Sequence, residues 1–329
     1  MDEKKQDILR MLLKNQDTHI SGQAISEQLG VSRTAVWKQI QGLIELGYEI
    51  ESVQKLGYRL IRTPDVLTEA EIEDQLETEF LGRSLHIHES IPSTQKLAHY
   101  LAEDKAVHGT VILAEEQTGG RGRLGRTWHS PKGTGIWMSL ILRPDLPIHK
   151  TPQLTLLAAV CVARAVQKVT GVTLEIKWPN DLLYKERKLV GILTELQAEE
   201  GTVKSVIIGI GMNVNTTRDQ VPEDIASIAT SLKQILGHSV SRPALVAAIL
   251  NELESLYTVY IEEGFHVIKL LWESYAISHG RLMYARTVKG TVIKGMSKGI
   301  TDDGILLLED EEGNTHHIYS ADIDLSKEE

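Results

Sequence analysis

Three apolar segments with the composition of β-strands follow one another between residues 174 and 214, with no helical segment between them. They read LEIKW (174–178), the stretch 188–198 and VKSVIIGIGMNV (203–214). Parallel neighbours would need a crossover of about a dozen residues, usually a helix, whereas antiparallel strands need only a short turn. This order therefore predicts a mixed, largely antiparallel sheet backed by helices, which is an α+β domain.

The segments around these strands extend the same pattern. Ser93 or Thr94 is expected to open a helix that runs through Leu97. A long apolar helix is expected from Pro152 to Thr170, where Gly171 ends it. Further strands are expected at 84–90, 110–116 and 135–143, and further helices at about 223–236 and 242–263.

The first 64 residues carry a different pattern. Residues 6–15 predict an amphipathic helix, and ISGQAISEQLGVSRTAVWKQIQGLIELGYEI predicts two more, separated at Gly30 and opened again by Ser32 as N-cap. Two short helices joined by a tight turn are typical of a helix-turn-helix. YEIESV and GYRLI, on either side of Gln54–Leu56, then predict a hairpin wing. The positions expected to be buried are Ala24, Ile25 and Leu29 in one helix and Val36, Ile40, Leu43 and Ile44 in the next, which Gly47 stops.

The outward face of that last helix indicates contact with DNA. Hydroxyl, amide and cationic side chains can bind phosphates and base edges, and no acidic residue interrupts them before Glu45. The alternative is a helical protein-interaction module with a solvated polar face. We expect these side chains to contact DNA: Ser32, Arg33, Thr34, Trp37, Lys38 and Gln41.

A domain boundary is expected near residues 64–67. Pro64 and Asp65 follow the wing, and TEAE then forms a capping box in which Thr68 is the N-cap and Glu71 is N3. The charge changes at the same place: residues 1–64 hold nine Lys/Arg against eight Asp/Glu, while the whole chain carries −10. We therefore expect domains at 1–64, 65–277 and 278–329.

Features of the whole chain indicate a cytoplasmic protein. It has 329 residues and one cysteine, Cys161, so no disulfide can form within it. Its charged N-terminus lacks the apolar run of a signal peptide, and no stretch approaches the ~20 apolar residues that span a membrane.

The stretch Gly119–Thr127 holds four glycines and three arginines. Its glycines satisfy G-x-G-x-x-G, but a dinucleotide site requires a helix directly after that motif, and Pro131, Gly133 and Gly135 exclude one here. A P-loop is excluded because no Gly-Lys-Ser/Thr follows.

This glycine-rich loop is instead interpreted as a lid that orders over an anion. Glycine makes the loop costly to order, and the arginine forks of Arg121, Arg123 and Arg126 suit carboxylate or phosphate. Because the three cations repel one another, we expect them to be poorly held until an anion binds. The alternative is a basic surface loop that binds nucleic acid or no ligand.

Polar residues end the strands downstream of this loop. KWPND (177–181) brings Lys177, Asn180 and Asp181 together, and RKLVGIL (187–193) places Lys188 before an apolar strand. GIGMNVN (209–215) supplies amides beside glycines that allow close approach of the backbone. Strand ends of one sheet can converge, so a site rich in cations is expected; Lys188 as a solvated strand end is the alternative.

Together, GRGRLGRTW, KWPNDLL, RKLVGIL and the STQ after IP resemble the biotin protein ligases, and in particular the bifunctional Bacillus-type ligase–repressors. The resemblance spans essentially the whole chain and implies a winged helix-turn-helix, a ligase domain related to class II synthetases and a C-terminal SH3-like β-barrel. It implies that biotin and MgATP form biotinyl-5′-AMP, and that biotin then passes to a lysine of the carrier domain of acetyl-CoA carboxylase and other biotin-dependent carboxylases.

The resemblance also implies roles for individual residues. Lys188, Arg123, Lys177 and Asp181 are the expected catalytic residues, with Asp181 orienting or deprotonating the incoming lysine. Asn180 and Asn213 are expected to contact the nucleotide or its metal ion. The expected biotin and adenylate contacts are Ser93, Thr94, Gln95, Gln117, Arg121, Gly122, Arg123, Lys188 and Gly191.

No metal held by the protein is expected, since the pairs His86–His88 and His316–His317 lack further ligands; Mg²⁺ is expected to arrive with ATP. Cys161 is interpreted as a small core residue, and the tail Ser326–Glu329 is not expected to make a contact at the site.

The resemblance also implies that the chain represses genes of biotin synthesis and uptake when biotinyl-AMP accumulates. Adenylate binding would favour a homodimer, which presents two helix-turn-helix units to an inverted repeat. A lipoate-type ligase and a ligand-sensing transcription factor without catalysis remain alternatives.

Overall fold

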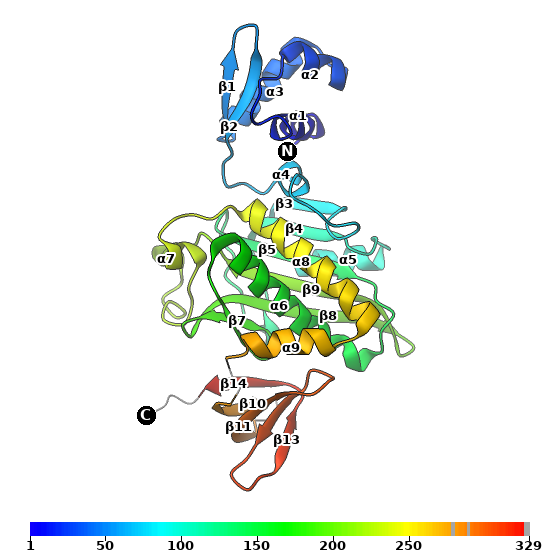
Figure 1. The fold of residues 1–329 in the computed structure, drawn as a ribbon, viewed down its shortest axis with the longest axis vertical. Coiled ribbons are helices and arrows are strands. Elements are labelled where there is room, and N and C mark those ends of the chain that lie inside the picture. Colours follow the sequence, from blue (N-terminus) through cyan, green and yellow to red (C-terminus); the bar gives the residue numbers. More distant parts are fainter. Residues whose placement is uncertain (278–279, 288–289, 326–329) are drawn as a thin grey trace. The chain divides into compact units, whose positions relative to one another are not determined.

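The computed structural model describes residues 1–277, 280–287 and 290–325. Its backbone contacts divide the chain into two units, one formed by Met1–Glu77 with Ser241–Ala247 and the other by Thr78–Val240 with Ala248–Glu329. The N-terminal helices and hairpin belong to the first unit, and the large sheet and the C-terminal strands belong to the second (Figure 1). A division into three domains, with boundaries after residues 64 and 277, stays a prediction.

The first unit contains the predicted helix-turn-helix and hairpin. Ser21 and Ser32 cap the second and third helices, because each hydroxyl accepts a hydrogen bond from the N–H three residues on. Gly30 has a left-handed φ of 63° and ends the second helix. The elements are α1 (Glu3–Leu13), α2 (Gly22–Leu29), α3 (Arg33–Glu45), β1 (Glu49–Val53), β2 (Gly57–Arg62) and α4 (Glu69–Glu73).

Two positions of the predicted apolar faces are wrong. Ile25, Ile40 and Leu43 are buried as predicted, but Ala24 is exposed and Ile44 is 41% exposed. Each exposed residue lies next to a buried one, and one step along an α-helix turns the side chain by about 100°. The buried face of each helix therefore contains fewer residues than the apolar residues of the sequence suggest.

The second unit is built on a seven-stranded sheet in the order β3-β4-β5-β9-β8-β7-β6. The pair β3–β4 is parallel and the other neighbouring pairs are antiparallel, which confirms the predicted mixed sheet. Its strands are β3 (Leu85–Ile91), β4 (Val111–Gln117), β5 (Gly135–Leu142), β6 (Glu175–Lys177), β7 (Asp181–Tyr184), β8 (Arg187–Glu199) and β9 (Thr202–Asn213).

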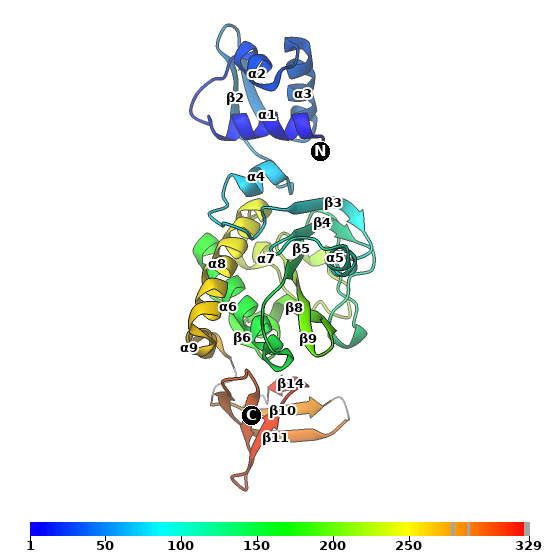
Figure 2. The ribbon, with the colours of Figure 1, turned by 90° about the vertical axis from the view of Figure 1, so that its right-hand side faces the viewer.

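Helices cover both faces of this sheet. On one face lies α5 (Thr94–Glu103), capped by Ser93, whose Ala98 and Ala102 share a buried cluster with Ile141 and Ile207. The other face is covered by α6 (Thr151–Thr170), which Gly171 ends as predicted, and by the second-unit part of α8 (Arg242–Glu263) (Figure 2). The face that carries α5 is the one on which the site is built.

Three details differ from the predicted elements. The helix expected at 223–236 forms only as α7 (Leu232–Leu236), and the residues before it make turns. The short strand β7 was not predicted, since it starts directly after the turn of KWPN. The helix α9 (His266–Tyr275), which packs against α6, was not predicted either.

One described helix, α8, is long and apolar enough to cross a membrane, contrary to the expectation that no stretch approaches that length. Within its most apolar window, 56% is buried inside the protein, which is the pattern of a core helix.

The C-terminal strands form a small antiparallel sheet in the order β13-β12-β11-β10-β14. Turns at Asp303–Gly304 and Glu312–Gly313 separate its middle strands. The indole N–H of Trp178 donates to the Gly304 carbonyl at 3.2 Å, so this sheet is tied to the strands of KWPND. The tail Ser326–Glu329 lies outside the described residues. The strands are β10 (Leu282–Thr287), β11 (Val292–Ile300), β12 (Leu306–Glu309), β13 (Thr315–Ile318) and β14 (Ala321–Leu325).

Candidate active site

A cavity of about 510 Å³ opens on the α5 face of the large sheet. Strands β5, β7, β8 and β9, the start of α5 and the glycine-rich loop contribute its walls. The site residues predicted for the ligase domain all line it, although they come from segments up to 120 residues apart. They are Ser93, Thr94, Gln95, Gln117, Arg121, Gly122, Arg123, Lys177, Asn180, Asp181, Lys188, Gly191 and Asn213.

Glycines form the floor of the cavity. Gly191 and Gly211 are direct partners across β8 and β9, and a Cβ on either would lie within 2.8 Å of Trp128. Since neither residue has a side chain, the indole of Trp128 can lie close to the sheet. The ammonium of Lys188 lies 5.3 Å from the centre of the indole ring, within cation–π range. Trp128 is therefore an apolar platform beside a cation.

One end of the cavity is neutral and rich in hydrogen bonds. The amide oxygen of Gln117 accepts from the backbone N–H of Thr94 at 2.9 Å and from its hydroxyl at 3.1 Å. The Gln117 amide N–H donates to Ser130 at 3.0 Å. Ser139 donates to the amide oxygen of Gln95 at 2.9 Å. Such a set of fixed hydroxyls and amides suits a polar, uncharged ring, because a wrong ligand would leave buried groups unpaired.

The other end of the cavity is charged. Lys188 Nζ lies 2.7 Å from Asp181 Oδ1, and Lys177 lines the same wall. Arg123 donates to the amide oxygen of Asn180 at 3.1 Å, and Asn180 in turn donates to the Ile192 carbonyl at 2.8 Å. Burial lowers the pKa of the Arg123 guanidinium, and the nearby carboxylates oppose that shift. A site with this set of cations suits a phosphate-bearing ligand.

Two arginines of the glycine-rich loop, Arg123 and Arg126, differ from the prediction that its three arginines are poorly held. Arg123 also donates to the Ser320 hydroxyl at 3.1 Å, and Arg126 forms an ion pair with Asp322. Both partners lie at the edge of the C-terminal sheet, since Ser320 directly precedes β14 and Asp322 is in it. The loop also holds itself, because the N–H of Gly122 donates to the Arg126 carbonyl at 2.8 Å. Thus the C-terminal sheet supplies partners that the local sequence pattern did not reveal.

Sequence reasoning missed several residues of this cavity. Trp128 ends the quoted motif GRGRLGRTW and could have been found there. Ser139 is a hydroxyl in the middle of an apolar strand, which is a signal for a buried polar contact. Ile228 and Ala229 also line the cavity, where the Ile228 carbonyl accepts the N–H of Lys188 at 2.6 Å. No local pattern points to that pairing.

The first unit presents a separate polar surface on α3. Ser32, Arg33 and Thr34 are exposed at its start, Trp37 is 55% exposed, and Lys38 follows on the exposed side. Gln41 is half-buried. The residues predicted to contact DNA thus lie on α3 or at its N-cap. The hydroxyl of Ser32 is used in the cap, because it accepts the N–H of Ala35.

Within the described residues, no group of three or more His, Cys, Asp or Glu side chains is placed to hold a metal ion. Cys161 is buried in α6, and burial raises the pKa of its thiol, as expected for a core residue.

Comparison with known proteins connects these features. Residues 87–213 match the model of the Biotin/lipoate A/B protein ligase family, residues 4–59 match that of an HTH domain, and residues 285–326 match that of the Biotin protein ligase C terminal domain. The chain is 51% identical over 321 residues to the bifunctional ligase/repressor BirA of Bacillus subtilis, with 98% of each chain covered. It is 33% identical over 299 residues to BirA of Escherichia coli, covering 91% of this chain and 90% of that protein. A solved structure of the biotin protein ligase from Aquifex aeolicus in complex with biotin and ATP superposes with a TM-score of 0.65 at 30% identity, covering 74% of this chain and 99% of that one.

Proposed function

This chain belongs to the biotin protein ligase family, in the group that combines a ligase with a repressor, and on that premise we propose that it activates biotin with ATP and transfers it to a lysine of a carrier domain. The proposal rests above all on the two ends of one cavity. A neutral, hydrogen-bonding end suits the ureido ring of biotin, and a cationic end suits the biotin carboxylate and the phosphates of ATP.

The first step joins two anions. An oxygen of the biotin carboxylate attacks the α-phosphorus of ATP, a new P–O bond forms, and the bond to the β-phosphate breaks with release of pyrophosphate. Lys188 and Arg123 line the charged end and would neutralise the reacting oxygens, with Lys177 in the same cavity and Arg121 and Gly122 on the loop. Asp181 holds Lys188 and Asn180 holds Arg123, so these two cations would need little reorganisation in the transition state.

Biotin recognition falls to the neutral end. Ser93, Thr94, Gln95 and Gln117 would bind the ureido ring by hydrogen bonds, while the bare backbone at Gly191 lets Trp128 lie close to the sheet beside the ligand. Trp128 offers the base of ATP an aromatic face, and Asn180 and Asn213 offer amides to the nucleotide. Mg²⁺ would arrive with ATP, held mainly by phosphate oxygens and water.

The second step forms the amide. The ε-amino group of the carrier lysine attacks the acyl carbon of biotinyl-5′-AMP, and the C–O bond to AMP breaks. The lysine side chain is an ammonium at neutral pH, and it must lose a proton before its amine can attack. Among the carboxylates that line the cavity, Asp181 is the one paired with Lys188, and we assign it to orient the carrier lysine or accept its proton. The carrier domain would be that of acetyl-CoA carboxylase or another biotin-dependent carboxylase.

The helix-turn-helix gives the chain its second role, repression at operator DNA. We propose that adenylate binding completes the ordering of the glycine-rich loop, whose Arg123 and Arg126 are already held, and favours a homodimer. The homodimer would place two copies of α3 on an inverted repeat in a cytoplasmic setting.

The deciding experiment is ATP–pyrophosphate exchange, followed by transfer to a carrier domain. Exchange that depends on biotin, with label on one carrier lysine, supports the ligase. Exchange driven by lipoate would favour a lipoate-type ligase, and ligand binding without transfer would favour a non-catalytic sensor. Gel shifts with inverted-repeat DNA that are indifferent to biotin and ATP would contradict the coupling to repression.

A further inference from the structure

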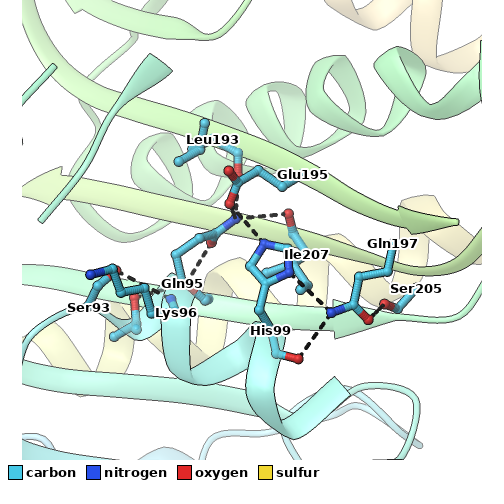
Figure 3. Close-up of polar contacts among 11 residues, drawn as sticks. Ser93, Gln95, Lys96, His99, Leu193, Glu195, Gln197, Ser205 and Ile207 are labelled. Carbon is cyan, nitrogen blue, oxygen red and sulfur yellow. Dashed lines mark hydrogen bonds and ion pairs between the residues drawn. The ribbon is translucent and has the colours of Figure 1, made fainter. Parts of the chain in front are cut away.

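A chain of hydrogen bonds leads from the cavity to a carboxylate outside it. Gln95 and His99 both lie on α5, and both side chains reach Glu195 on β8 (Figure 3). The Gln95 amide nitrogen donates to Glu195 Oε2 at 2.9 Å, and His99 Nε2 lies 3.0 Å from the same oxygen. Gln95 lines the cavity, whereas Glu195 and His99 do not. In the described part of the chain, the Glu195 side chain reaches the cavity's hydrogen-bond network through Gln95.

The partners of Gln95 decide which way its amide points. An amide could be turned over with little change in shape, so its neighbours must choose the orientation. The carboxylate of Glu195 and the carbonyls of Leu193 and Ile207 can only accept, which assigns the nitrogen to their side. Of these three contacts, the one to Glu195 is the shortest, since both carbonyls lie 3.4 Å away. The amide oxygen must then face Ser139.

This orientation propagates toward the cavity. Ser139 has one hydroxyl proton, and it donates that proton to the Gln95 oxygen at 2.9 Å. Thr94 Oγ1 lies 2.9 Å from Ser139 Oγ, so in that contact Ser139 can only accept. Thr94 gives its own proton to Ser139 or to Gln117 and receives none from either. Its oxygen keeps a lone pair for a donor that enters the cavity.

A second series of hydrogen bonds also ends at Glu195, and its donors likewise point toward the carboxylate. Ser205 donates to the amide oxygen of Gln197 at 2.8 Å, which turns the Gln197 nitrogen toward His99 Nδ1 at 3.2 Å. The amide nitrogen of Gln197 donates, so Nδ1 is the acceptor in that contact; in this tautomer the ring proton lies on Nε2 and points at Glu195. Two donors thus converge on one carboxylate oxygen, which holds the side chain of Glu195 in place (Figure 3).

We propose that Glu195 is a positioning residue for ligand recognition: it sets the direction of the chain Thr94–Ser139–Gln95, so that Thr94 accepts an N–H from the ureido ring. This inference rests on the proposed function, because it names the part of biotin that Thr94 reads. A ureido N–H is a donor without charge, and a buried hydroxyl oriented as an acceptor discriminates strongly in its favour.

The test compares Glu195→Met, which removes the acceptor, with Glu195→Gln, which keeps an acceptor oxygen. Calorimetry with biotin alone is expected to show binding about tenfold weaker for E195M, because a charge-assisted hydrogen bond is lost, and within about twofold of wild type for E195Q. Glu199→Met is the matched control: Glu199 is on the same strand but pairs with exposed Lys204 at 3.3 Å. Its biotin affinity should not change.

A second readout separates positioning from a merely structural effect. Biotin methylated on one or the other ureido nitrogen lacks one donor, and wild type should bind one of the two isomers much more weakly than biotin. In E195M, and in Ser139→Ala, which breaks the same chain elsewhere, that penalty should shrink at least about threefold. An unchanged penalty in both variants, or normal biotin binding by E195M, would overturn the role of Glu195. A wild-type chain that binds no biotin would instead overturn the proposed function.

Discussion

The ammonium of Lys188 lies 2.7 Å from Asp181 Oδ1, across the strand pair β7–β8, inside the cavity that holds the predicted site residues. The pair is partly exposed, with about a third of the Lys188 side chain accessible. It is therefore a weak contributor to stability and is better understood as a device that holds two functional groups in place.

Replacing Lys188 with Met should abolish most adenylation. The variant loses a fixed cation at developing negative charge, and removal of one such group typically costs about 100- to 1000-fold in rate. Biotin-dependent ATP–pyrophosphate exchange measures this step. The control is Lys204→Met, an exposed lysine of β9 paired with Glu199, which should exchange like wild type. Full activity of K188M would contradict the assignment.

Asp181→Asn should separate the two steps. Adenylation needs the cation more than its counter-ion, so exchange should stay within a few-fold of wild type. Transfer needs a proton acceptor or an orienting carboxylate, and loss of general base catalysis slows a step by about 100-fold or more. Single-turnover transfer from preformed biotinyl-5′-AMP to a carrier domain measures it. If exchange and transfer fall equally, Asp181 acts only through Lys188.

Most of the residues that line the site were predictable from the sequence. The contacts between the glycine-rich loop and the C-terminal sheet were not. Lys177, Asn180 and Lys188 stand out as polar residues at the ends of apolar strands, so periodicity alone draws attention to them. Ser320 and Asp322, by contrast, contact Arg123 and Arg126 across almost 200 residues of chain, and no local pattern encodes such a pairing. The prediction of a helix over residues 223–231 was wrong for another reason. These residues form turns, and Ala229 pairs with the backbone of Lys188, so this tertiary pairing outweighs helix propensity.

Asp322→Asn should loosen the glycine-rich loop without unfolding the protein. Its ion pair with Arg126 is largely exposed, so the effect on stability should be below about 1 kcal/mol. Local opening should nonetheless increase, and limited trypsin cleavage at the arginines of the loop should become a few-fold faster. Asp303→Asn, in an exposed turn of the C-terminal sheet, is the control. Equal cleavage rates in all three proteins would show that Asp322 does not restrain the loop.

Glu71 should make the first unit less stable as pH rises. Burial raises the pKa of its carboxyl, which the hydroxyls of Tyr48 and Thr68 only partly oppose by donating to it at 2.9 Å. A raised folded pKa means that this contribution is complete below the unfolded value of 4.5 and is lost as pH passes the folded value. Exchange protection of α1 amides in the full chain, corrected for intrinsic rates, should therefore fall from pH 5 to 8. Glu71→Gln should flatten that fall, and parallel curves for both proteins would contradict the explanation.

Arg33→Ala with Lys38→Ala should remove DNA binding and leave the ligase intact. Both residues lie on the exposed side of α3, where cations release counter-ions from phosphates. Each lost phosphate contact should lower the slope of log affinity against log salt concentration by about one. Gel shifts or anisotropy with an inverted-repeat operator, in the presence of biotin and ATP, measure this change.

The control for that experiment is Lys14→Ala, since Lys14 is an equally exposed cation of the same unit at the end of α1. If α3 is the reading helix, K14A should keep both the affinity and the salt slope, because net charge alone does not place a cation against a phosphate. Biotin-dependent exchange should be equal in all variants, since the cavity lies in the other unit. Equal losses of operator affinity in K14A and in the α3 double variant would show that bulk charge, rather than the face of α3, carries the binding.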